Sequence, residues 1–246
     1  MIDKEKKVHL KKVRLHPEKY PTRSLYPFSL KLFQEPENIT FNSPVTFFAG
    51  ENGTGKSTLL KALCHKCNVT IWRYNARTRF ENNPFEERLY ETIDIEWTDG
   101  RVEGAFFSSQ TFRDFSQILD EWAAADAGIL EYFGGRSLMT QSHGQSLLSY
   151  FRSRYRVKGI YFMDEPETAL SPGSQIELLR VIGGTSKAGH AQFIIATHSP
   201  ILLAYPEAEI YSFDHIPLKR IAYEETKHFR IYRDFMTDRE KYFKDL

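Results

Sequence analysis

Short, continuous apolar runs alternate along the chain with segments whose apolar positions recur every three or four residues. The continuous runs predict strands buried on both faces of a parallel sheet, and they lie at 45–49, 159–163 and 193–196. The periodic segments predict helices, which lie at 112–133, 147–155 and 172–182. Gly183-Gly184 is expected to end the last helix. Because strand and helix alternate, the pattern predicts an α/β domain with a mainly parallel core sheet.

Alternation with a period of two residues indicates a second kind of sheet. Val8–Leu15 mixes apolar with basic residues and predicts an edge strand with one solvent-facing side. Strands at 92–97 and 101–107 flank Asp99-Gly100, a dipeptide typical of a tight hairpin. We therefore expect an antiparallel β extension near 69–107, attached to the core sheet. Other strands are expected at 28–33, 209–213 and 218–223, and a charged terminal helix at 230–245.

Composition narrows the class of protein. The 246 residues carry 33 basic and 32 acidic side chains, so the formal charge of +1 requires neither nucleic acid nor an anionic membrane as partner. An arginine- and aromatic-rich segment at 69–80 leaves two interpretations open, a site for single-stranded nucleic acid or a solvated strand face. Residues 1–12 carry no secretory signal, and no run is long enough to cross a bilayer. We expect a soluble, cytoplasmic protein.

The two cysteines, Cys64 and Cys67, give no disulfide framework and fit a reducing compartment. One such pair cannot supply four zinc ligands. We therefore expect both thiols to pack in the core rather than to hold a metal.

The stretch from Gly50 to Thr58 fits the phosphate-binding loop pattern of glycine, four residues and then Gly-Lys-Ser. An apolar strand precedes it and a helix follows, as the motif requires. The loop's N–H groups and the positive end of the helix can bind phosphate oxygens. We expect Lys56 to reach the outer phosphates and Ser57 to bind Mg²⁺. The residues expected to hold the nucleoside triphosphate are Asn52, Gly53, Thr54, Gly55, Lys56, Ser57 and Thr58.

Two carboxylates, Asp164 and Glu165, end the apolar run at 159–163. A strand end beside a phosphate-binding loop is where an acid can meet the metal ion. Asp164 suits Mg²⁺, directly or through water, whereas Glu165 suits the role of base toward the attacking water. The roles must be separate, because a carboxylate neutralised by a metal is a poor base.

In this order, the motifs resemble those of the ABC-type ATPases. Asp164-Glu165 is similar to that family's Walker B motif and catalytic glutamate, and 167–171 to its D-loop. His198, in Thr-His-Ser-Pro, is similar to the switch histidine, which contacts the γ-phosphate or the attacking water. Gln110 stands where the family carries its Q-loop glutamine, which the resemblance makes a ligand of Mg²⁺. The catalytic residues implied are thus Glu165, His198 and Lys56.

The segment from Ser142 to Ser146 resembles the family's signature loop, with His143 in place of its first glycine. The resemblance implies that Ser142, Gly144 and Gln145 cap an ATP bound by a second copy of the chain. A homodimer would then enclose two ATP molecules. Within the family, the chain is most similar to stand-alone, soluble ATPases with a Ser-His-Gly signature, which also share the sequence of 197–206.

We expect one domain, 1–246, with a nucleotide-binding core at 1–110 and 156–246 and a helical subdomain at 111–155. The predicted function is ATP binding and Mg²⁺-dependent hydrolysis by a dimerising switch that acts on a macromolecular partner. Two alternatives stay open: the ATP-binding subunit of a membrane transporter, and a nucleotide-dependent binding module without turnover. Tyr26 and Phe28 are the candidates to stack on adenine, and ordinary packing is the alternative for each.

Overall fold

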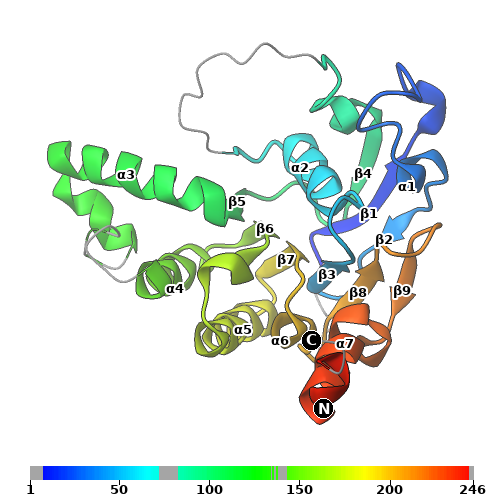
Figure 1. The fold of residues 1–246 in the computed structure, drawn as a ribbon. Coiled ribbons are helices and arrows are strands. Elements are labelled where there is room, and N and C mark those ends of the chain that lie inside the picture. Colours follow the sequence, from blue (N-terminus) through cyan, green and yellow to red (C-terminus); the bar gives the residue numbers. More distant parts are fainter. Residues whose placement is uncertain (1–7, 72–82, 134, 136, 138–142, 244–246) are drawn as a thin grey trace, which may run out of the picture.

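The computed structural model describes residues 8–71, 83–133, 135, 137 and 143–243. A six-stranded sheet runs through its centre in the order β5-β6-β7-β3-β8-β9. Its strands are β3 (Val45–Ala49), β5 (Gly104–Ser108), β6 (Gly159–Asp164), β7 (Ala191–Ala196), β8 (Glu209–Ser212) and β9 (Lys219–Ile221). Neighbouring strands are parallel except for β8 and β9, which confirms the predicted mainly parallel core (Figure 1).

Helices cover both faces of this sheet. One face packs against α2 (Lys56–Lys66), and the other against α4 (His143–Arg154) and α5 (Pro172–Lys187). Alternation along β7 shows why its run from Phe193 to Ala196 is apolar: Phe193 and Ile195 lie in the cluster that contains α5, and Ile194 lies in the cluster that contains α2. The other helices are α1 (Lys31–Gln34), α3 (Ser109–Ala125), α6 (Pro200–Leu203) and α7 (Lys227–Thr237).

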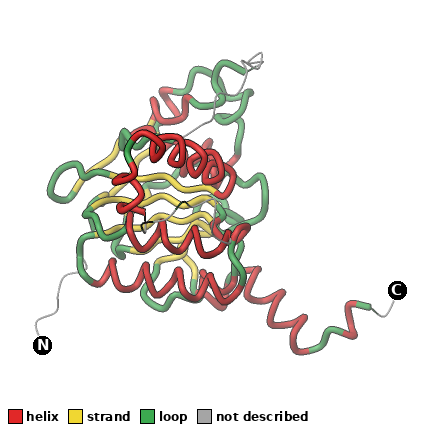
Figure 2. Tube along the Cα trace, turned by 90° about the vertical axis from the view of Figure 1, so that its left-hand side faces the viewer, coloured by secondary structure: helices red, strands yellow, loops and turns green. Residues whose placement is uncertain are grey.

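The C-terminal helix α7 leads away from the body of the molecule (Figure 2). None of its side chains is buried, and Met236 is 80% exposed. It begins at Lys227, three residues before the expected start, because the Thr226 hydroxyl caps it by accepting from Phe229 N. No helix in the described residues is both long and apolar enough to cross a membrane.

A second, three-stranded sheet has the order β2-β1-β4 and is antiparallel. It consists of β1 (Leu10–Leu15), β2 (Ile39–Thr40) and β4 (Ile93–Trp97). The expected edge strand is therefore the central strand of this sheet, although its predicted alternation is real: Leu10 and Val13 are fully buried while Lys11 and Arg14 are exposed. The antiparallel extension exists, but it is built from three distant segments of the chain.

The expected hairpin around Asp99-Gly100 does not form. β4 pairs with β1, whereas β5 enters the core sheet parallel to β6, so the turn connects two sheets. The burial of the two strands explains the difference. In β4, buried or half-buried positions alternate with exposed ones, while Phe106 and Phe107 of β5 are both buried. A strand with two apolar faces is more stable between the layers of the core than at a solvated edge.

Three further expectations about local structure are wrong. The segment at 28–33 is not a strand but leads into α1, with Phe28 and Phe33 buried in the core. Trp122, which the three- and four-residue spacing of apolar residues in 112–133 places on one face with Leu119, is 44% exposed, although Leu119 is buried. α5 does not stop at Gly183-Gly184 but continues to Lys187. Packing against α4, α6 and β7 holds the helix through both glycines, despite their low helix propensity.

The continuation of α5 gives a stability test. Gly184 is an exposed helical residue, and a Cβ built there meets no atom within 4 Å. We expect Gly184→Ala to raise the free energy of unfolding by about 0.5–1 kcal/mol, because alanine restricts the unfolded chain without a clash. Urea denaturation measures this, with Gly183→Ala as the matched control, since its Cβ would lie 3.2 Å from the Tyr205 hydroxyl. A less stable Gly184→Ala protein would contradict the helix.

Candidate nucleotide-binding site

The loop between β3 and α2 is held in a conformation that depends on glycine. Gly50 has a φ of +152°, and a Cβ there would lie 3.0 Å from Phe213 Cβ. Gly55 has a φ of +102° and precedes the first residue of α2. Left-handed backbone of this kind turns successive N–H groups toward one point in front of the helix. The loop and helix start thus have the backbone geometry of the anion-binding frame that the motif predicts.

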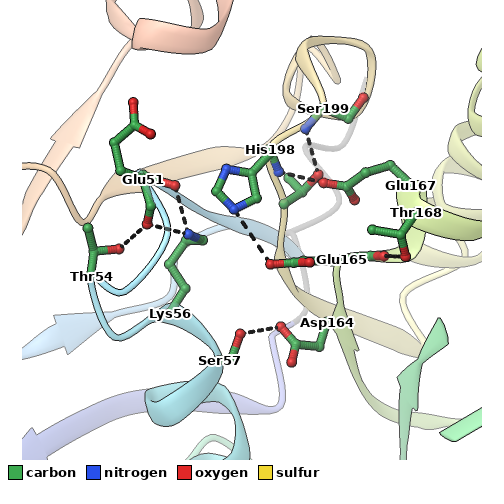
Figure 3. A network of polar contacts seen from close by, with 12 residues as sticks. Glu51, Thr54, Lys56, Ser57, Asp164, Glu165, Glu167, Thr168, His198 and Ser199 are labelled. Carbon is green, nitrogen blue, oxygen red and sulfur yellow. Dashed lines mark hydrogen bonds and ion pairs between the residues drawn. The ribbon is translucent and has the colours of Figure 1, made fainter. Parts of the chain in front are cut away.

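Lys56 lies inside this frame and is only 4% exposed. Its Nζ donates to Gly50 O at 2.7 Å and to Glu51 O at 2.8 Å, as Figure 3 shows in part. Burial lowers the pKa of Lys56, and the nearby carboxylates of Glu165 and Asp214 oppose that shift. The ammonium group is therefore already desolvated at the centre of the loop, which strengthens its attraction for a phosphate.

Ser57 and Asp164 meet beside the loop. The Ser57 hydroxyl donates to Asp164 Oδ1 at 2.7 Å, joining the start of α2 to the end of β6 (Figure 3). Burial raises the pKa of Asp164, and the hydrogen bond from Ser57 opposes the rise. A hydroxyl and a carboxylate facing one another are the oxygen ligands that Mg²⁺ accepts together with phosphate. The pair fits the predicted metal site.

Glu165 points from the next residue toward His198. Its backbone is left-handed, with φ 47° and ψ 55°, which is unusual for a residue with a Cβ. Its Oε1 lies 3.5 Å from His198 Nε2, and its side chain is 38% exposed. Burial lowers the pKa of His198, and the Lys56 ammonium lowers it further. A carboxylate open to solvent and a neutral imidazole thus lie together above the loop (Figure 3).

Glu167 positions the histidine segment, and the sequence did not assign it a role. Its Oε1 accepts from the backbone N–H of His198 at 2.6 Å. Burial raises the pKa of Glu167, while this hydrogen bond lowers it. The only sequence signal was its place in the segment that resembles the D-loop. The bond connects the segment after β6 to the segment after β7, so it fixes where His198 stands relative to Glu165.

Asp214 is a second residue that the sequence did not single out. It follows β8, and its Oδ1 accepts from Glu51 N at 2.9 Å. The bond joins the start of the phosphate-binding loop to the segment that follows β8, the strand next to β3. No motif marks this residue, because its role depends on β8 lying next to β3 in the sheet.

The remaining expected site residues lie near the starts of α3 and α4 or beyond the described part of the chain. Gln110 is in the first turn of α3, two residues after Ser108, which pairs with Asp164. Gly144 and Gln145 begin α4, on the face of the sheet opposite α2, where a Cβ on Gly144 would lie 3.3 Å from Ser174 Oγ. Ser142 and the arginine-rich run from Trp72 to Phe80 lie outside the described residues.

The two residues considered for stacking on adenine, Tyr26 and Phe28, differ in their exposure to solvent. Phe28 is fully buried and packs on Tyr20 with ring centroids 4.6 Å apart, so it cannot stack on a nucleotide. Tyr26 is 40% exposed, and its hydroxyl lies 2.7 Å from Thr58 Oγ1. It lines a cavity of about 70 Å³ with Lys61 and His65 of α2. Tyr26 stays the candidate.

Cys64 and Cys67 are buried at 0% and 1% exposure within the core beneath α2. Burial raises the pKa of both thiols, to about 12 for Cys67. Both behave as small apolar side chains that pack α2 against its neighbours.

Comparison with known proteins agrees with the fold and the loop. A family described as an AAA domain matches residues 27–101, and another, described as an AAA domain, putative AbiEii toxin, type IV TA system, matches residues 146–204. An SMC head bound to the C-winged helix domain of ScpA has the same fold, with a TM-score of 0.50 and 12% identity over 87% of this chain and 98% of that chain. These matches support the resemblance to the ABC-type P-loop ATPases.

Two other matches were found for this chain. The ribose import ATP-binding protein RbsA of Caldanaerobacter subterraneus subsp. tengcongensis is 26% identical over 185 residues, which are 68% of this chain. The match covers 37% of that relative's length, so the chain corresponds to little more than a third of it. A chain of a putative metal-chelate type ABC transporter aligns over 92% of this chain and 88% of its own, with 15% identity and a TM-score of 0.49.

The structural role of Glu167 can be tested without nucleotide. Glu167→Ala removes the acceptor from the partly buried N–H of His198, so we expect the free energy of unfolding to fall by about 1–3 kcal/mol. Glu167→Gln keeps an acceptor oxygen and should lose less. Urea denaturation compares the three proteins. If the alanine variant is as stable as the wild type, the bond does not hold the histidine segment.

Proposed function

We propose that this ATPase binds ATP with Mg²⁺ and hydrolyses the γ-phosphate. One observation carries the proposal: an ammonium, a hydroxyl–carboxylate pair, a second carboxylate and an imidazole meet from the ends of three neighbouring strands. Lys56 and Ser57 follow β3, Asp164 and Glu165 end β6, and His198 follows β7. The carboxyl ends of parallel strands are where α/β sheets place ligands.

Each side chain has a role that its surroundings support. Lys56, already desolvated, binds the outer phosphates as a point charge. Glu165 is partly exposed and can accept a proton from the attacking water, and His198 holds that water or a γ-phosphate oxygen. Ser57 and Asp164 would hold Mg²⁺, which when bound supplies neutralisation of the phosphate charge. The loop residues 52–58 would hold the phosphates through their backbone N–H groups.

We propose further that the working unit is an ATP-dependent homodimer. Within one chain, Gly144 and Gln145 begin α4 on the face of the sheet opposite the helix α2 that follows the loop. We therefore infer that they cap an ATP held by another copy rather than the ATP that the same chain holds. A second copy, turned to place its α4 start over the loop, would complete the site together with its Ser142. Gln110 would complete the Mg²⁺ site from the start of α3, with 111–155 acting as a helical subdomain.

The kind of partner that the dimer acts on distinguishes two candidate functions, a stand-alone switch and a transporter subunit. We favour a stand-alone switch in the cytoplasm, where Cys64 and Cys67 stay reduced, acting on a protein or nucleic acid. The likeness to RbsA, named as an ATP-binding protein of ribose import, favours the alternative of a transporter subunit. Co-purification with a membrane-embedded chain would support the alternative, and recovery with a water-soluble partner would support the switch.

The phosphate-binding role of Lys56 can be measured directly. Lys56→Ala removes the buried positive charge at the centre of the loop, so we expect ATP affinity to fall by about tenfold or more, the equivalent of at least about 1.4 kcal/mol. Isothermal titration calorimetry with ATP and Mg²⁺ gives the dissociation constant. Lys187→Ala, a change at an exposed lysine at the C-terminal end of α5, is the control. Unchanged affinity in Lys56→Ala would rule out the loop as the ATP site.

The catalytic carboxylate can be separated from binding. Glu165→Gln removes the base but keeps the shape, so we expect ATP binding to persist while hydrolysis falls by about a hundred- to ten-thousandfold. With ATP held intact, the variant should accumulate as a dimer, which size-exclusion chromatography with light scattering detects. A variant that binds ATP and stays monomeric would contradict the composite site, and one that hydrolyses at the wild-type rate would contradict the role of Glu165.

A further inference from the structure

His198 has a partner that the family motifs do not include. Its Nδ1 lies 3.0 Å from Nε2 of His228, and the two ring centroids are 5.1 Å apart at an interplanar angle of 67°. His228 is the second residue of α7, the helix that leads away from the body of the molecule. The short first stretch of this helix therefore reaches the side chain proposed to contact the γ-phosphate.

The hydrogen bond between the rings restricts where their protons lie. A neutral imidazole has one N–H and one bare nitrogen, so only one of the two facing nitrogens carries the proton. The outer nitrogens, His198 Nε2 and His228 Nδ1, are buried and have no hydrogen bond with any described residue. Glu165 Oε1 lies 3.5 Å from the first of them.

One of the two arrangements is favoured. If His228 Nε2–H donates, His198 carries its proton on Nε2 and presents an N–H to the Glu165 carboxylate. If His198 Nδ1–H donates, a bare nitrogen faces that carboxylate, and His228 keeps a buried N–H without an acceptor. In the second arrangement the lone pair of His198 Nε2 faces those of the Glu165 carboxylate, which is repulsive. The buried N–H of His228 also has no acceptor, which costs about 1–3 kcal/mol.

Burial favours the neutral form of both rings, as this bond requires. Burial is the largest cause that lowers the pKa of each ring. Lys56 also lowers the pKa of both rings, and His198 lowers the pKa of His228. The carboxylates of Glu51 and Asp214 oppose these shifts for both rings. Lys227, beside His228 on α7, lies 4.0 Å from Asp214 and offsets part of that negative charge.

We propose that His228 is a positioning residue, which holds His198 as the Nε2–H tautomer and directs that N–H toward Glu165 and the γ-phosphate. The inference rests on the proposed role of His198 in hydrolysis. A ring held in this way offers a hydrogen bond where negative charge develops in the transition state, at no cost of reorientation. Loss of His228 should therefore lower kcat and leave ATP binding nearly unchanged.

Three variants separate positioning from packing. His228→Phe keeps the ring and removes the hydrogen bond, so kcat should fall about ten- to a hundredfold while the ATP dissociation constant stays within about twofold. His228→Gln places an amide N–H near the position of the imidazole Nε2 and should restore kcat to within about threefold of wild type. His215→Phe changes an exposed histidine bonded to Ser212 and should leave kcat unchanged.

A double-variant cycle with His198→Ala distinguishes failure of this inference from failure of the proposed function. If His228 acts through His198, the double variant should be no slower than His198→Ala alone. A slow His198→Ala with a fully active His228→Phe would overturn the positioning role only. A fully active His198→Ala would overturn the proposed role of His198 itself. Equal losses of kcat in the Phe and Gln variants would show that His228 only packs.

¹⁵N NMR of protein with ¹⁵N-labelled histidine identifies the tautomer of His198 and does not depend on ATP hydrolysis. We expect His198, assigned by its loss in His198→Ala, to show a protonated Nε2 and a bare Nδ1. In His228→Phe the two tautomers should both be populated. A wild-type protein with the proton on Nδ1 of His198 would overturn the inference, whatever the ATPase rates are.

Discussion

The buried ammonium of Lys56 is the constraint on which the site depends. A charge that is only 4% exposed must be compensated nearby, since desolvation of an unpaired ion costs several kcal/mol. Two backbone carbonyls of the loop supply direct hydrogen bonds, and Asp164, Glu165 and Asp214 surround it with negative charge. Those carboxylates come from β6 and from the residues after β8, so only the observed strand order places them around β3.

Local sequence determines the parts of this site that the motifs predicted. The loop at 50–58, the strand ending in Asp164-Glu165 and the His198 segment each need only a short stretch of chain, and the structure has each where the pattern placed it. Glu167, Asp214 and His228 were not predicted, because each acts through a neighbour that the fold brings close. Asp214 is 163 residues from Glu51, and no periodicity connects them.

The wrong predictions about the fold also arise from contacts between distant parts of the chain. Asp99-Gly100 does form a turn, but the two flanking strands are assigned to different sheets by their burial, which a dipeptide cannot report. Gly183-Gly184 favours a helix end, yet the packing of α5 outweighs the propensity of two residues. Val8–Leu15 has the alternation of an edge strand, and becomes central because β2 and β4 pair on both its sides. Tertiary contacts decided each case.

The proposed chemistry follows from the separation of roles around Lys56. Asp164 is hydrogen-bonded to Ser57, Glu165 is open to water, and His198 is held by hydrogen bonds with Glu167 and His228.

The rate of phosphate release per chain, measured in ATP and Mg²⁺ over a wide range of protein concentration, tests the account most directly. A composite site shared by two copies predicts that the rate per chain rises with concentration and then saturates. A rate per chain that is constant throughout would contradict the shared site, and no release at any concentration would contradict the account as a whole.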